Sequence, residues 1–212
     1  RSELAALPEE MRRHIFTCAG EWCGLNGQSE QAMYFFHRVG DYEKILSLEF
    51  RGMEFELTEE TRVADLLQDI LEHTDAEIKL RHPVSVVKII FILFGAGRYE
   101  EFGRWCGEMS ALCDGSSLPE PEKNRLSGEL SLLTSFTRFN DISEMGALMR
   151  CAHELLGGRP SLIQMNDAWS FGCPSALFLY HSTPGRLDTE LADMTENCSH
   201  YFALTQGHGS GG

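Results

Sequence analysis

The sequence predicts an all-α fold, a superhelix of antiparallel helix hairpins with about ten helices in total. One pattern recurs over residues 22–32, 93–102 and 136–145: an amphipathic stretch ends in a short glycine-rich or polar break, and a second stretch follows. Breaks of this length join two helices into an αα-hairpin. Stacked hairpins form a solenoid whose concave surface suits binding. The pattern therefore favours a binding module over an enzyme.

The first three predicted helices lie close together in the sequence. Residues 8–25 form the first, with apolar residues at spacings of three and four. This spacing assigns the core face to Met11, Ile15, Cys18, Ala19 and Trp22. A partner helix is predicted over 28–38, with Gly40 as its C-cap. Asp41 then caps a third helix. Residues 51–58 alternate as a short strand would, and a loop fits them equally well.

The middle of the chain contains a very apolar stretch. A helix is predicted over 58–71, and Pro83 suits the first turn of the next one. Residues 84–94 are nearly all apolar and would by themselves also fit a buried strand. We interpret them as a central helix because the neighbouring stretches repeat the hairpin pattern. The predicted partner of this helix is 99–112.

Capping signals define the remaining predicted helices. Ser117 and Glu120 form a capping box, which predicts a helix running to about residue 137. Asp141 and Glu144 form an acidic variant that starts the next helix, and Gly157 ends it. A short helix is predicted over 174–181. A long amphipathic helix follows, with an apolar face of Leu187, Leu191, Met194, Cys198, Tyr201 and Phe202.

The composition excludes several classes of function. The chain has 212 residues, 42% of them hydrophobic and 24% charged, as in an ordinary globular protein. Its net charge is −14, and its densest basic stretch is only Arg12–His14. We therefore expect no direct binding of nucleic acid or of an anionic membrane. The longest apolar run, 84–94, is too short to span a bilayer.

The seven cysteines and the two ends of the chain complete this description. The cysteines form no C-x-x-C pair, so we expect reduced thiols in a cytoplasmic protein, and no metal site. The chain begins with Arg-Ser and ends in Gly-Ser-Gly-Gly, which indicates a piece of a longer protein. We expect residues 1–212 to form a single helical-repeat domain, in which a sub-boundary could fall near 51–58.

The candidate binding residues lie in one irregular stretch, and no catalytic set is predicted. Aromatic side chains, a histidine and hydroxyls gather between two helices, a mixture that suits a ligand pocket. The candidates are Trp169, Phe171, Tyr180 and His181, with His208 as a further polar contact. The same stretch could instead be a loop packed over the core. Residues 207–212 match G-x-G-x-x-G, but no strand precedes them, so a dinucleotide site is not expected.

The order of several short motifs resembles a bacterial subgroup of MalT-like transcription regulators of the LuxR family. The resemblance covers residues from about 10 to the end. The motifs that carry it are Ala19–Trp22, Asn26–Gly27, Ala32, Gly40–Glu43, Asn140–Ile142, His153–Gly158, Trp169–Ser175, Pro184–Asp188 and Gly207–Gly211. It implies the front part of a tetratricopeptide-like superhelix, which in such STAND-type regulators binds an inducer or a regulatory protein and supports self-association of the full-length protein.

The chain departs from the full regulator in two respects. It contains no Walker A sequence and no basic recognition helix, so ATP binding and DNA binding are expected only in segments outside this chain. The expected role is effector sensing or protein interaction, without a cofactor of its own. Two alternatives remain: a pure protein-interaction scaffold without a small-molecule pocket, and an enzyme with a cluster of perturbed titratable groups.

Overall fold

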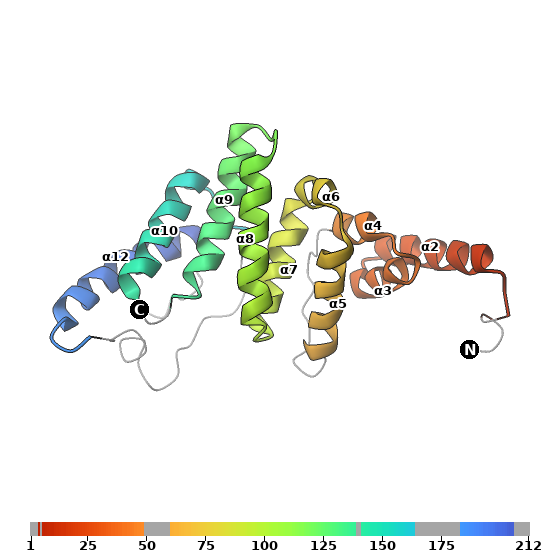
Figure 1. Cartoon of the computed structure of the whole chain (residues 1–212), viewed down its shortest axis with the longest axis horizontal. Helices are drawn as coiled ribbons and strands as arrows, with labels where there is room; N and C mark the ends of the chain where they lie inside the picture. Colours follow the sequence, from red (N-terminus) through yellow and green to blue (C-terminus); the bar gives the residue numbers. More distant parts are fainter. Residues whose placement is uncertain (1–3, 5, 49–59, 139–140, 164–182, 206–212) are drawn as a thin grey trace. The chain divides into compact units, whose positions relative to one another are not determined.

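The computed structural model describes residues 4, 6–48, 60–138, 141–163 and 183–205 (Figure 1). These residues contain ten helices and no strand, which confirms the all-α prediction. The chain divides into two compact units, Arg1–Ala96 and Gly97–Gly212, and each is described by itself. Stacking of all the hairpins into one superhelical domain stays a prediction. The sub-boundary expected at 51–58 falls outside the described residues.

The first unit begins with the predicted hairpin of α2 (Glu9–Leu25) and α3 (Ser29–Val39). The two helices lie side by side (Figure 1). They approach closely at Gly20, where a Cβ atom would lie 2.6 Å from the ring of Phe36. Phe36 is itself buried, together with Ala32 and Met33 on the same face of α3. A small residue on α2 thus permits the contact that closes the hairpin.

Four further helices complete the first unit. They are α4 (Tyr42–Ser47), α5 (Glu60–His73), α6 (Ala76–Arg81) and α7 (Pro83–Gly95). The apolar stretch is helical, as predicted, and α7 packs against α4, α5 and α6. Its residues Val86, Ile89, Ile90 and Leu93 are fully buried. The short α6 was not predicted, because six residues are too few for a periodic pattern.

The second unit consists of α8 (Tyr99–Gly115), α9 (Glu120–Ser135), α10 (Ile142–Leu156) and α12 (Leu187–Thr205). Helix α9 packs on both α8 and α10, and α10 packs on α12. The cap predicted at Asp141 is confirmed, since its carboxylate accepts the backbone N–H of Glu144 at 2.9 Å. Gly157 ends α10 with a φ of 59°, a conformation that favours glycine.

The capping box predicted at Ser117 is wrong. Helix α9 begins at Glu120, its N-cap position is Pro119, and no side chain caps it. Pro119 disfavours a helical conformation at Leu118, the residue before it, and residues 117–119 lie outside the helix. The hydroxyl of Ser116, one residue earlier than predicted, accepts the backbone N–H of Leu118 instead.

The face predicted for α2 is also wrong. Met11, Ile15 and Trp22, assigned to the core, are 50%, 38% and 59% exposed. The helix buries Gly20 and Cys23 instead, on the side that faces α3. The pattern contained a genuine apolar stripe, but a stripe does not reveal which side of the helix has a partner. The close approach at Gly20 decides it.

The face predicted for α12 is confirmed at Tyr201, which is buried, but is wrong at three other positions. Leu187, Leu191 and Phe202 are 42%, 40% and 43% exposed. The buried residues of this helix include the polar Glu190, Asn197 and Thr205, beside Tyr201 and Leu204. Each of the three polar residues makes a hydrogen bond: Glu190 accepts the N–H of Thr183 at 3.3 Å, Asn197 donates to the carbonyl of Ile142 at 2.8 Å, and the hydroxyl of Thr205 donates to the carbonyl of Tyr201 at 2.9 Å. Polar partners therefore rotate the buried face away from the apolar stripe.

Candidate functional site

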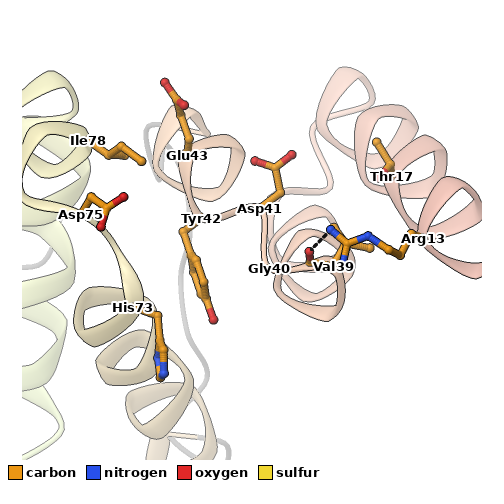
Figure 2. A pocket seen from close by; sticks show the side chains of 10 residues that line it. All are labelled: Arg13, Thr17, Val39, Gly40, Asp41, Tyr42, Glu43, His73, Asp75 and Ile78. Carbon is orange, nitrogen blue, oxygen red and sulfur yellow. Dashed lines mark hydrogen bonds between the residues drawn. The ribbon is translucent and has the colours of Figure 1, made fainter. Parts of the chain in front are cut away.

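The first unit contains an open cleft of about 500 Å³ (Figure 2). It lies where the α3–α4 turn and the α5–α6 turn approach α2. Its volume is within the range usual for small-ligand sites, roughly 300–1,000 Å³. Ten residues line it: Arg13, Thr17, Val39, Gly40, Asp41, Tyr42, Glu43, His73, Asp75 and Ile78.

The turn between α3 and α4 positions one wall of the cleft. Gly40 has a φ of 68°, which lets the chain reverse immediately after α3. Asp41 caps α4 by accepting the backbone N–H of Lys44 at 3.2 Å, so that Tyr42 begins the helix. The guanidinium of Arg13 donates to the carbonyl of Val39 at 2.8 Å, which fastens α2 to the same turn (Figure 2).

A hydrogen-bonded group centred on Asp69 supports the floor of the cleft. Nε2 of His37 lies 2.6 Å from Oδ2 of Asp69. Nδ1 of His73 lies 3.2 Å from Oδ1 and 2.9 Å from the Asp69 backbone carbonyl. A carboxylate and a carbonyl can only accept, so both imidazoles donate to Asp69. In the neutral form of His73 this leaves Nε2 as an acceptor.

Tyr42 forms the aromatic part of the site. Its ring stacks on that of His73, with centroids 5.8 Å apart and planes at 14°, and meets the ring of His37 edge-on at 6.2 Å. Burial, and secondarily the negative charge of Asp69, raise the pKa of Tyr42. The hydroxyl therefore stays protonated at neutral pH, where it can both donate and accept.

The charges of the cleft are unequally neutralised. Asp41 lies 3.7 Å from the ammonium of Lys44, and Glu43 is paired with Arg81. Asp75 makes no ion pair or side-chain hydrogen bond with any residue the structure describes. The side chain of Asp75 lies near Ile78 and lines the cleft (Figure 2). An unpaired carboxylate near an aromatic ring suits a cationic ligand group, which gains from both.

The structure does not describe the residues that the sequence proposed for a site. Trp169, Phe171, Tyr180, His181 and His208 all lie outside the described residues. The cleft was missed because its lining comes from segments that are far apart in the sequence. The one available signal was the tight Gly40–Glu43 turn, which marks two helix boundaries and belongs to the motifs of the family resemblance.

The described residues contain no set of three or more His, Cys, Asp or Glu side chains arranged to hold a metal ion. No helix among them is long and apolar enough to cross a bilayer.

Comparisons with family models, with curated proteins and with solved structures each found no match.

Proposed function

We propose that this chain is a binding module whose cleft in the first unit takes a cationic group, an ammonium or a guanidinium. The observation that carries the proposal is Asp75, a carboxylate that has no partner among the described residues, in a cleft that Tyr42 and His73 also line. The cation would come from a small amine or from a lysine or arginine of a bound peptide. Both sources present the same chemistry to the site.

The residues that line the cleft provide several hydrogen-bond acceptors for a cation. The carboxylate of Asp75 can form a charge-assisted hydrogen bond, which is roughly twice as strong as a neutral one. The hydroxyl of Tyr42 and Nε2 of His73 can accept further N–H groups of the same cation. Arg13 is the fixed cation that lines the cleft. Its guanidinium already donates a hydrogen bond to the Val39 carbonyl, so fewer of its N–H groups are available to an anion.

The proposed biological role is that of an effector-sensing or partner-binding region without catalysis. It rests on the helical-hairpin fold together with the resemblance to MalT-like regulators of the LuxR family. In such a cytoplasmic regulator, a ligand held between the two turns would favour one arrangement of the helices and so control ATP-binding and DNA-binding segments outside this chain. The alternative is a protein-interaction scaffold without a small effector, which the openness of the cleft to solvent also permits.

Calorimetric titration of the full chain tests the cleft, with two probes: spermidine, and a short arginine-containing peptide with neutral ends. We expect at least one probe to bind, and Asp75→Asn to weaken it at least about tenfold, the loss of one charge-assisted contact. The matched control is Asp114→Asn, an exposed aspartate of the second unit. Binding of spermidine indicates an effector site, and binding of the peptide alone indicates a scaffold.

Two results would contradict the cleft proposal: neither probe binds, or Asp75→Asn and Asp114→Asn weaken binding equally. The regulatory role has a separate test. In a transcription reporter driven by the regulator that contains this chain, Asp75→Asn should reduce the response to its effector, whereas Asp114→Asn should not.

A further inference from the structure

Among the described residues that line the cleft, His73 is the one histidine. It is the last residue of α5, and its side chain is 57% exposed. Its ring and that of Tyr42 approach each other from α5 and α4, with centroids 5.8 Å apart (Figure 2). Imidazole is the only side-chain group whose ordinary pKa, about 6.5, lies between pH 5 and pH 8. The cleft therefore contains one side chain of a type that ordinarily changes its charge near neutral pH.

Asp69 determines which nitrogen of His73 can accept a proton. Nδ1 lies 2.9 Å from the backbone carbonyl of Asp69 and 3.2 Å from Oδ1, and both oxygens can only accept. Nδ1 therefore carries the hydrogen of the neutral ring, and Nε2 carries the lone pair. Nε2 has no partner among the described residues. A proton or an N–H group of a ligand can occupy this lone pair, but not both at once.

We propose that a proton on Nε2 of His73 competes with the bound cation, so that the cleft releases its ligand as the pH falls below neutrality. This regulation rests on the proposed function of the cleft. Protonation turns Nε2 from an acceptor into a donor and adds a positive charge to the cleft wall. Both changes disfavour an ammonium or a guanidinium at the same place. The proton and the cation thus exclude each other at one atom.

The charged and titratable groups around His73 come from every helix that borders the cleft. They are Asp69 of α5, His37 of α3, Asp41, Tyr42 and Glu43 at the start of α4 with the ion-pair partners Lys44 and Arg81, Asp75 before α6, and Arg13 of α2. Of these, only His37 is a second imidazole. Its Nε2 lies 2.6 Å from Oδ2 of Asp69, so that carboxylate opposes any charge His37 gains. A proton on Nε2 of His73 instead sits on the nitrogen that Asp69 does not bind.

The size of the expected effect follows from the fraction of rings that are unprotonated. For an imidazole with the ordinary pKa, this fraction is about 0.9 at pH 7.5 and about 0.1 at pH 5.5. A site that binds only in its unprotonated form loses apparent affinity in proportion to the fraction. We therefore expect the dissociation constant of the cation to rise about tenfold between pH 7.5 and pH 5.5.

Calorimetric titration of the full chain at pH 7.5, 6.5 and 5.5 tests this competition. The probe is the one that binds the cleft, spermidine or the arginine-containing peptide, at constant ionic strength. Ammonium and guanidinium groups stay almost fully charged over this range, so a change in affinity reports on the protein. At pH 6.5 binding should release roughly half a proton, which titrations in buffers of different ionisation enthalpy measure. Circular dichroism at each pH should show the same helix content.

Two matched substitutions assign the effect to one ring. His73→Gln removes the titrating group and retains an amide that can accept a hydrogen bond. Whatever its affinity at pH 7.5, the ratio of its dissociation constants at pH 5.5 and pH 7.5 should fall to about one. His14→Gln changes an exposed histidine of the same unit that does not line the cleft, and it should keep the wild-type ratio. If His73→Gln binds too weakly to measure, the proton release of the wild-type chain decides.

The competition and the cation site fail in different ways. A wild-type chain that binds equally tightly at pH 7.5 and pH 5.5, or that releases no proton, would overturn the competition and leave the cation site standing. A pH dependence that survives His73→Gln would do the same. Absence of binding at every pH would overturn the cation site and, with it, its regulation by His73.

Discussion

Two groups of polar side chains, one in each unit of this chain, contrast in their exposure to solvent. In the first unit the group formed by His37, Asp69 and His73 is open to water, with side chains 30%, 39% and 57% exposed. In the second unit Glu129 is 0% exposed and Asn197 is 3% exposed. Polar groups that are exposed to solvent can still bind a ligand, whereas buried polar groups form their hydrogen bonds within the fold.

Glu129 is a buried carboxylate whose two oxygens both accept hydrogen bonds from within the second unit. It accepts the hydroxyl of Ser161 at 2.6 Å and the backbone N–H of Leu162 at 2.9 Å. The N–H of Ser161 in turn donates to the carbonyl of Leu204 at 2.8 Å. The segment that follows α10 is thus tied to α9 through Glu129 and to α12 through its backbone. The comparison predicts that substitutions in the second unit change stability, and that substitutions in the cleft change binding.

The largest expected effect is at Gly146, where α10 touches α12. A Cβ atom there would lie 1.9 Å from Oδ1 of Asn197, and that side chain is held by its hydrogen bond to the Ile142 carbonyl. Gly146→Ala should therefore lower the free energy of unfolding by about 2–4 kcal/mol, through overpacking and loss of the hydrogen bond. Urea denaturation measures the change.

The matched control for this substitution is Gly103→Ala. Gly103 is an exposed glycine of α8 whose added Cβ would meet nothing within 4 Å. It should raise stability by roughly 0.5–1 kcal/mol, because alanine is the better helix former. If the two variants behave alike, the α10–α12 contact does not depend on the absence of a side chain at Gly146.

The next effect is expected at Glu129. Glu129→Leu leaves the Ser161 hydroxyl and the Leu162 N–H without their acceptor inside the unit, which should cost about 2–3 kcal/mol. Glu122→Leu, on the exposed first turn of the same helix, should stay within about 0.5 kcal/mol of the wild type. Equal losses in the two variants, measured by urea denaturation, would show that the buried hydrogen bonds do not stabilise the unit.

The pH dependence of stability tests the same residue without a change of shape. Burial raises the pKa of Glu129 above its usual 4.5, although the bonds from Ser161 and Leu162 and the charge of Arg125 oppose the rise. The folded state therefore holds this proton more tightly than the unfolded state. The resulting stability is present below the unfolded pKa and is lost as the pH rises through the folded pKa.

Glu129→Gln should remove this dependence. Its stability relative to the wild type should rise as the pH increases above about 4.5, the side of the unfolded pKa set by the direction of the shift. Denaturant titrations at several pH values in that range measure the difference. A difference that is constant with pH would mean that Glu129 keeps its ordinary pKa in the folded chain.

A smaller stability effect is expected at Asp69, below the cleft. Asp69→Asn removes the charge that holds His37 and His73 but leaves an amide oxygen as acceptor. Because the group is partly exposed, the loss should be only about 0.5–1 kcal/mol. It should shrink at high salt if charge attraction dominates. A loss as large as that of Glu129→Leu would remove the contrast between the two units.

Local signals predicted most of the elements but not the faces that α2 and α12 bury. Gly40, Asp41, Asp141 and Gly157 act within a few residues of the chain, and each marks a helix boundary where it was expected. The core faces of α2 and α12 depend on which helix lies opposite. A sequence that places apolar residues on a solvent face gives no sign of that partner.

The candidate site was beyond prediction for a related reason. His37 and Asp69 are 32 residues apart in the sequence, and neither belongs to a recognisable motif. They meet because α3 and α5 approach each other in the folded unit. The five residues that the sequence predicted for a site lie outside the described residues, so their role stays a prediction. They are Trp169, Phe171, Tyr180, His181 and His208.

The central claim is that the cleft of the first unit binds cations while the buried polar groups of the second unit serve only the fold. Nuclear magnetic resonance of the isotopically labelled full chain, titrated with spermidine, tests it most directly. Our account predicts saturable shifts confined to amides around Arg13, residues 39–43 and residues 73–78, and their loss in Asp75→Asn. Shifts centred on Glu129 or Asn197, or weak shifts spread over the acidic surface, would contradict it.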